Sequence, residues 1–155
     1  MITDNLLVVS GSNTFSSGVA TITGQTVTST AVSTDKIDLG TARDIGEGRD
    51  LYMVFTVITA YSGGTSVTMD VVTDDNAALS SPTTRASTGA IAVGSLTAGA
   101  QFVVSIPPLV ASLGERYLGA NYTVSGSPSA GSILAQVVEG IQDGRKYYSS
   151  GFTLV

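Results

Sequence analysis

The run LYMVFTVITAY, residues 51–61, constrains the fold more than any other stretch of this chain. It is the longest nearly uninterrupted apolar run, and it is rich in β-branched and aromatic residues, which favour strands. Side chains alternate along a strand, so one face carries Leu51, Met53, Phe55 and Val57 and the other carries Tyr52, Val54 and Ile58. A strand that is apolar on both faces is covered on both faces. The run therefore predicts the central strand of a packed sheet.

A loop crowded with charges of both signs precedes this strand. It holds more than a third of the charged residues of the chain, namely Asp35, Lys36, Asp38, Arg43, Asp44, Glu47, Arg49 and Asp50. In one interpretation, neighbouring opposite charges form ion pairs that only hold the loop in shape. In the other, they meet the surface of a partner. Exposed ion pairs contribute about 0–1 kcal/mol each, so stability alone explains such a cluster poorly.

Composition excludes several classes of chemistry. The chain has no cysteine and no histidine, so a Ser-His-Asp triad, a cysteine nucleophile and a zinc site with histidine ligands are all excluded. The net charge is −5 and no basic patch stands out, which argues against binding to nucleic acid. Only 12% of residues are charged, against a typical ~25%, and such a surface favours association with a protein partner.

No motif indicates catalysis. The sequence lacks a P-loop, a G-x-S-x-G elbow and a dinucleotide fingerprint. Two carboxylate groups, Asp38/Asp44/Glu47 and Asp74/Asp75, are weak candidates for a hydrolase. Asp74, Asp75 and Asn76 have oxygen ligands for Ca²⁺ but not the spacing of an EF-hand, so a solvated turn is the favoured interpretation. We expect a protein that is not an enzyme and that uses no cofactor and no metal.

The remaining pattern predicts about seven or eight strands separated by turns at roughly ten-residue intervals. Residues 51–61 and 65–73 are expected to form a hairpin across Ser62-Gly63-Gly64, and residues 74–100 to form mostly loop with a short strand near 90–93. Further strands are expected over 19–33 (one, or two broken at Gly24), 101–106, 115–125 and 132–141. This is typical of an all-β antiparallel sandwich or jelly roll.

The chain reads as one domain with an N-terminal extension. Residues 1–18 are expected to form an arm, either laid on a neighbouring molecule or frayed, and residues 19–155 a single β-sandwich domain. No signal peptide and no apolar run long enough for a membrane helix is present, so we expect a soluble protein made in the cytoplasm, without a membrane partner.

Several short motifs in a fixed order carry a resemblance to a known family. They are Ile37-Asp38-Leu39-Gly40, Arg43-Asp44-Ile45-Gly46, Arg116-Tyr117-Leu118 with Tyr122, Ser150-Gly151-Phe152 and the opening Met1-Ile2-Thr3-Asp4. In order and spacing the chain resembles the Bbp16 family of capsid cement proteins of tailed bacteriophages. The resemblance implies a jelly-roll protein on the outer surface of the virion head. Its partners would be the HK97-like major capsid protein and further copies of itself, as a homodimer or homotrimer.

Capsid or cement–cement contacts are expected at a small set of residues: Phe15, Arg43, Asp44, Glu47, Arg49, Arg145 and Tyr147. The alternative function is a carbohydrate-binding β-sandwich of a phage tail or surface protein. In that case tyrosines would stack on sugar rings, with Tyr61, Tyr117, Tyr147 and Tyr148 as the candidates.

Overall fold

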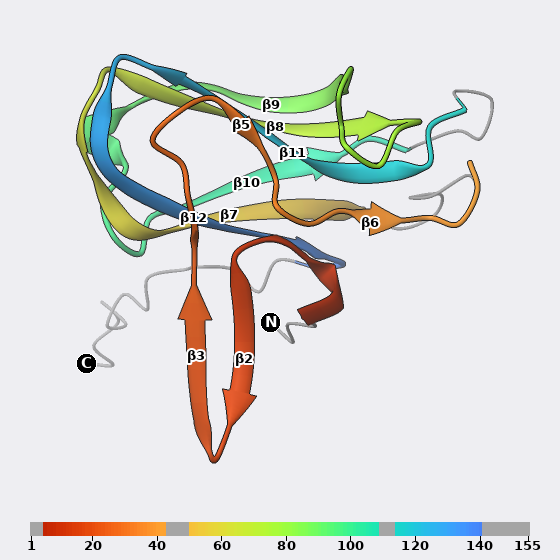
Figure 1. Cartoon of the computed structure of the whole chain (residues 1–155), viewed down its shortest axis with the longest axis horizontal. Coiled ribbons are helices and arrows are strands. Elements are labelled where there is room, and N and C mark those ends of the chain that lie inside the picture. The colour runs from red at the N-terminus through yellow and green to blue at the C-terminus, as the bar shows by residue number, and fades with distance from the viewer. Residues whose placement is uncertain (1–4, 43–49, 109–113, 141–155) are drawn as a thin grey trace, which may run out of the picture.

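Two antiparallel sheets form the body of the protein in a computed structural model, which describes residues 5–42, 50–108 and 114–140 (Figure 1). The first sheet runs β1 (Val8–Ser10), β12 (Pro128–Val138), β7 (Leu51–Gly63), β10 (Gln101–Ile106), with β4 (Gln25–Thr26) also paired to β12. The second runs β5 (Ala31–Val32), β11 (Tyr117–Ser125), β8 (Ser66–Asp74), β9 (Thr83–Ala92), with β6 (Ile37–Asp38) also paired to β11. Together they confirm the expected all-β antiparallel sandwich.

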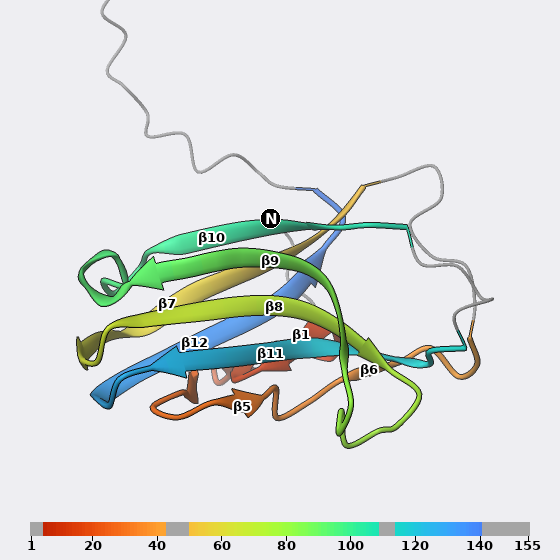
Figure 2. The same ribbon diagram turned by 90° about the horizontal axis from the view of Figure 1, so that it is seen from above.

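The strand order is that of a jelly roll. We count β1 and β4 together as strand 1 and β5 and β6 together as strand 2, and we number the remaining strands of the sandwich in chain order. The order of neighbouring strands across the two sheets is then 1-8-3-6 and 2-7-4-5. In this eight-strand numbering of the described sandwich, the chain changes sheets at every connection except the one between β8 and β9, which are neighbours in the second sheet. Figure 2 shows the second sheet in front, with β7 and β12 crossing behind it.

The core lies between the two sheets and follows the alternation of the strands. Met53, Phe55 and Val57 of β7 are fully buried and face the core side chains of β8, β11 and β12. The ring of Tyr122 meets Phe55 edge-on, with ring centroids 6.1 Å apart, and its hydroxyl donates a buried 2.6 Å hydrogen bond to the Ser10 hydroxyl of β1. The first strand of the sandwich is thereby tied to its centre.

The expected hairpin between residues 51–61 and 65–73 is wrong. β7 and β8 belong to different sheets, and the chain crosses between them through Gly63 and Gly64, whose φ angles are +72° and +79°. Both strands point alternate apolar residues at the same core, so their patterns fit a hairpin and a sheet crossing equally well. The hairpin partner of β8 is β9 instead.

The expected loop over residues 74–100 is also wrong in its middle, because β9 extends from Thr83 to Ala92. This strand is mostly exposed or half-buried and lacks an apolar run. It is held mainly by its ladder to β8. The loop expectation holds for residues 75–82, and residues 93–100 carry only the short 3₁₀ helix η2 (Val93–Ser95).

The structure divides the N-terminal segment at other residues than the expected arm (1–18) and domain (19–155). After a 3₁₀ turn, η1 (Asn5–Leu7), strand β1 joins the sandwich, and β2 (Ser12–Ser16) and β3 (Val19–Thr23) then form a separate hairpin that projects from it (Figure 1). The expected boundary between residues 18 and 19 falls at the tip of this hairpin. The expected break at Gly24 is confirmed, because it separates β3 from β4. No helix in the described residues has the length and hydropathy to cross a bilayer.

Candidate functional site

Charge is distributed unevenly between the two ends of the sandwich. Apart from Asp70 in the centre of β8, the charged residues that the structure describes lie in the half where β6, β8, β10 and β12 end: Asp35, Lys36, Asp38, Asp50, Asp74, Asp75, Arg85, Glu115, Arg116 and Glu139. The connections at the opposite end, residues 27–30, 62–65, 93–100 and 125–127, contain no charged residue, and neither does the hairpin. We call these the charged end and the uncharged end.

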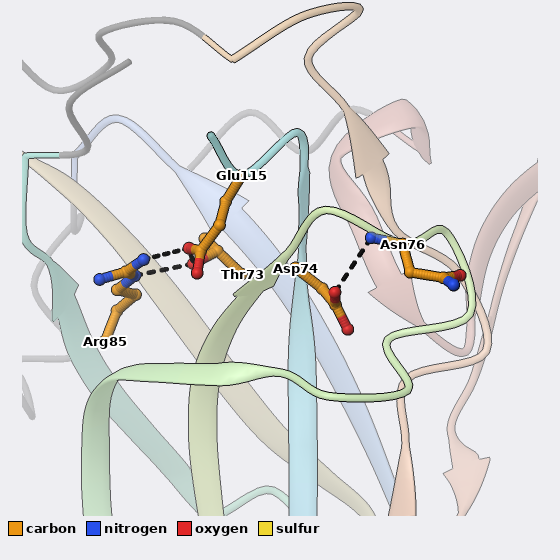
Figure 3. A network of polar contacts seen from close by, with 5 residues as sticks. All are labelled: Thr73, Asp74, Asn76, Arg85 and Glu115. Atoms are coloured by element: carbon orange, nitrogen blue, oxygen red, sulfur yellow. Dashed lines mark hydrogen bonds and ion pairs between the residues drawn. The ribbon is translucent and has the colours of Figure 1, made fainter. Parts of the chain in front are cut away.

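A half-buried ion pair ties three strands together at the charged end. Arg85 of β9 donates to Glu115, just before β11, and its Nε donates to the Thr73 hydroxyl of β8 at 2.7 Å (Figure 3). Thr73 also donates to Glu115. Burial alone would raise the pKa of Glu115, but the hydrogen bonds from Thr73 and Arg85 outweigh it and lower that pKa below its ordinary value.

Asp74 shapes the loop that follows β8. One carboxylate oxygen accepts a hydrogen bond from the backbone N–H of Asn76 at 3.0 Å (Figure 3), and the other accepts one from the backbone N–H of Ser81 at 3.0 Å. Both bonds lower the pKa of Asp74. The loop then places buried Leu79 against Gly119 of β11, where a Cβ would come within 2.6 Å of the leucine side chain. The aspartate therefore acts as a turn residue. Among the residues that the structure describes, no group of three or more His, Cys, Asp or Glu could hold a metal ion.

An exposed ion pair lies beside this network. The guanidinium of Arg116 donates two hydrogen bonds to the Asp38 carboxylate, at 2.5 and 2.6 Å, and lies 5.2 Å from the ring centre of Tyr117. The hydrogen bonds from Arg116 and from the backbone of Gly40 lower the pKa of Asp38 to about 2. Because both side chains are more than two-fifths exposed, the pair orients the surface more than it stabilises the fold.

Backbone contacts hold the uncharged end together. The N–H of Thr65 donates to Ser125 at 2.8 Å, which joins the β7–β8 crossing to the β11–β12 crossing. Gly126, with φ +81°, lies so close to the first crossing that a Cβ there would come within 2.9 Å of the Gly64 Cα. The carbonyl of Thr65 accepts from Val93 of η2 at 3.1 Å. The two sheet crossings therefore interlock through glycine.

The β2–β3 hairpin is largely exposed, above all along β3. Its two-residue turn, Ser17-Gly18, has positive φ at both positions (+51° and +80°), as a type I′ turn requires. All five residues of β3 are exposed, including Val19 at 61% and Ile22 at 50%. Gly11 and Gly24 mark where the hairpin leaves and rejoins the sandwich. A Cβ on Gly11 would meet the Thr23 carbonyl at 2.2 Å, and one on Gly24 would meet the Ser132 hydroxyl at 2.9 Å.

A shallow open groove of about 420 Å³ lies between the base of the hairpin and the first sheet. On the hairpin side it is lined by Ile22, Thr23, Gly24 and Thr26. On the sheet side it is lined by Ile58 and Thr59 of β7 and by residues 130–132 of β12. It contains no charged group. Its sheet side is rigid, since the Ser132 hydroxyl donates to the Thr59 hydroxyl at 2.8 Å and accepts from the Thr59 N–H at 3.1 Å.

Most of the interface residues expected from the sequence lie outside the described residues: Arg43, Asp44, Glu47, Arg49, Arg145 and Tyr147. The backbone of Phe15 lies in β2, opposite Ala20. Among the tyrosines considered for sugar stacking, Tyr61 is buried against Gly131 and cannot stack on a ligand. Burial raises its pKa to about 12. Tyr117 is half-buried beside Arg116.

Contacts were expected at Phe15 and along the arm over residues 1–18, which includes β2, but β3 and the groove were not among the expected sites. A turn signal was present in the sequence: the Ser17-Gly18 dipeptide directly precedes the β-branched stretch VATIT, residues 19–23. The sparse apolar residues over 19–33 indicated only a half-exposed edge strand. They gave no indication that this strand leaves the sandwich.

Comparison with known proteins places the chain in one family. The sequence profile of Bbp16 matches residues 20–137, which is most of the chain and nearly the whole sandwich. No curated protein matches the chain.

Proposed function

The chain belongs to the phage-associated Bbp16 family, and on that premise we propose that it is a capsid cement protein of a tailed bacteriophage. The family match over residues 20–137 carries the proposal. In this role the protein binds the outer surface of an HK97-like head across junctions between major capsid subunits. It has a structural role and not an enzymatic one.

The physical chemistry of the role is mass action. A protein that binds only the assembled lattice stabilises the lattice by its binding free energy, because disassembly must first release it. When each copy touches several subunits, modest contacts reinforce one another through their high effective concentration. The net charge of −5 means that the protein is not attracted to the packaged DNA.

The fold supports this role in two ways. The projecting hairpin and the uncharged end of the jelly roll offer surfaces with little charge to desolvate on contact. The charged end, with its half-buried network, can present fixed charges to a partner. The loop residues Arg43 and Arg49 belong to the same charge cluster in the sequence, and we assign them to shell contacts.

The test is co-sedimentation of the purified protein with expanded, undecorated heads of its own phage, followed by thermal release of DNA. We expect saturable binding that raises the release temperature. Failure to bind such heads would overturn the proposal, and a screen against glycans would then test the carbohydrate-binding alternative.

A double charge reversal, Arg43→Glu with Arg49→Glu, tests the assignment of the loop. We expect weaker binding to heads with an unchanged melting temperature of the free protein. The matched control is Lys36→Glu, which reverses one exposed cation just before β6. Full binding by a folded double variant would show that Arg43 and Arg49 do not contribute to the interface, and it would not contradict the cement role.

A further inference from the structure

We propose that the outer edge of β3 pairs with β3 of a second copy of this chain. The two strands run antiparallel about a twofold axis at Thr21 and form a continuous four-stranded sheet, β2-β3-β3-β2. This contact between two copies is distinct from the shell contacts assigned above.

The edge of β3 offers a defined set of hydrogen-bonding groups. β3 pairs with β2 in the register Ser16↔Val19, Thr14↔Thr21 and Ser12↔Thr23, and no other described strand pairs with it. In a hairpin with a two-residue turn, the residues flanking the turn exchange both hydrogen bonds, and alternate residues do so from there on. The N–H and C=O groups of Ala20 and Ile22 therefore point outward, away from β2.

This edge also lacks the features by which proteins block strand addition. Edge strands are commonly protected by charged side chains, proline or bulges. The edge strand β9 carries Arg85 and has an irregular register, and the edge strand β10 runs into Pro107-Pro108. β3, with the sequence VATIT, has five exposed residues, no charge, no proline and an unbroken register. A strand of this kind is suited to main-chain pairing with a partner.

The sequence of β3 is complementary to itself in one register. With the twofold axis at Thr21, each Ala20 lies opposite Ile22 of the second copy, and the outward groups of both residues are used in four hydrogen bonds. Val19 then lies opposite Thr23, so β-branched side chains meet across the strands, and the two Thr21 side chains face each other. A twofold interface requires this self-complementarity.

The groove at the base of the hairpin fits this same register. In the same register, Gly18 of the second copy lies opposite Gly24, and Val19 of the second copy lies opposite Thr23. Both Thr23 and Gly24 line the groove, together with Ile22 and Ile58. The hairpin tip of each copy therefore reaches the uncharged groove of the other, where the exposed Val19 side chain can be covered.

Single cysteines test the register directly, because the natural chain has none. In Thr21→Cys, the two cysteines occupy a non-hydrogen-bonded antiparallel pair, with Cα atoms about 4.5 Å apart, which is within reach of a disulfide. In the control Thr14→Cys, the cysteines are three strand spacings apart, about 14 Å. Under mild oxidation at about 50 μM protein, we expect a cross-linked dimer for the first variant only. A monomeric Thr21→Cys, or equal cross-linking of the control, would overturn the proposal.

A charge at the axis provides a second measurement. Thr21→Lys brings two like charges face to face in the paired strands, whereas Thr14→Lys places the same charge on the neighbouring strand. In sedimentation equilibrium, we expect the wild type and Thr14→Lys to dimerise and Thr21→Lys to dimerise at least tenfold more weakly. Equal association by the two variants, or a monomeric wild type, would contradict the pairing. None of these measurements involves heads, so their outcome is separate from that of the co-sedimentation.

Discussion

The two ends of the sandwich accomplish the same task by different chemistry. Both ends must hold in place the loops that connect the strands of the sandwich. At the charged end, the side chains of Arg85, Glu115 and Asp74 do so through ion pairs and hydrogen bonds to loop backbone. At the uncharged end, glycine lets the backbones approach until they touch, as at Gly64 and Gly126.

Because of this difference, the stability of the two ends depends on different conditions. Carboxylate networks depend on pH and salt, whereas close backbone packing depends on neither. The uncharged end therefore tolerates changes of solvent but not an added methyl group. The charged end tolerates small changes of shape but not the loss of a charge. Four predictions test this contrast, beginning with the largest expected effect.

Gly126→Ala is expected to have the largest effect on stability. Alanine at φ +81° is strained, and its Cβ would lie 2.9 Å from backbone atoms of Gly64 and Thr65, which cannot move aside like a flexible side chain. We expect a loss of about 3 kcal/mol or more in the free energy of unfolding, measured by urea denaturation. The control is Gly89→Ala, at φ +68° with no atom within 4 Å of the added methyl, for which we expect about 1–2 kcal/mol. Equal losses would show that the interlock contributes nothing beyond strain.

Glu115→Gln is expected to have the next largest effect. The amide leaves the half-buried guanidinium of Arg85 without its carboxylate, which is expected to lower the free energy of unfolding by about 1–3 kcal/mol. Asp35→Asn, the same change at an exposed position, is the control, with an expected effect within about 0.5 kcal/mol. If both variants match the wild type in urea denaturation, charge does not hold this end together.

Acid sensitivity is expected to come from the charged end. The pKa values of Glu115 and Asp74 are lowered in the folded protein from ordinary values of 4.5 and 3.8. Their contribution to stability is therefore complete above about pH 4.5 and is lost as the pH falls through the lowered values. We expect the melting temperature to fall below pH 4.5, and to fall less steeply in Glu115→Gln. An identical acid slope in the variant would remove Glu115 from this explanation.

Asp38→Asn is expected to have the smallest effect. Its ion pair with Arg116 is exposed, so solvent and salt screen it even though its geometry is good. We expect a smaller change in melting temperature than for Glu115→Gln, and no difference from the wild type in 1 M NaCl, where the Debye length is about 3 Å. A large fall in melting temperature that persists in high salt would show that this pair stabilises the fold as the half-buried network does.

The sequence was sufficient to predict the fold class and the main core strand, because apolar alternation is a local property. Met53, Val54, Phe55 and Val57 of this run are buried, so the strand is covered on both faces there, as expected. The alternation does not specify which sheet a strand joins, and this is why β7 and β8 were wrongly paired. β9 was missed because its side chains are mostly small and polar, and only its ladder to β8 defines it as a strand.

The candidate surfaces were less predictable than the core. The charge cluster before residue 51 was visible in the sequence. The ion-pair partners were not, because Arg85 pairs with Glu115 and Arg116 pairs with Asp38, which are distant in the chain. The projection of the hairpin depends on Gly11 and Gly24 at its base, whose close approaches become apparent only in three dimensions. Contacts between residues distant in the chain are not encoded in local pattern.

The position of β12 between β1 and β7 has a consequence for how the protein is made. Val8 pairs with Gln136, and β12 also carries the longest ladder to β7, so the first sheet cannot close until the last strand has left the ribosome. At about 5–20 residues per second, the first strand waits on the order of 10 s for its partner. Closure of the first sheet therefore follows the synthesis of β12 and depends on contacts between residues far apart in the chain.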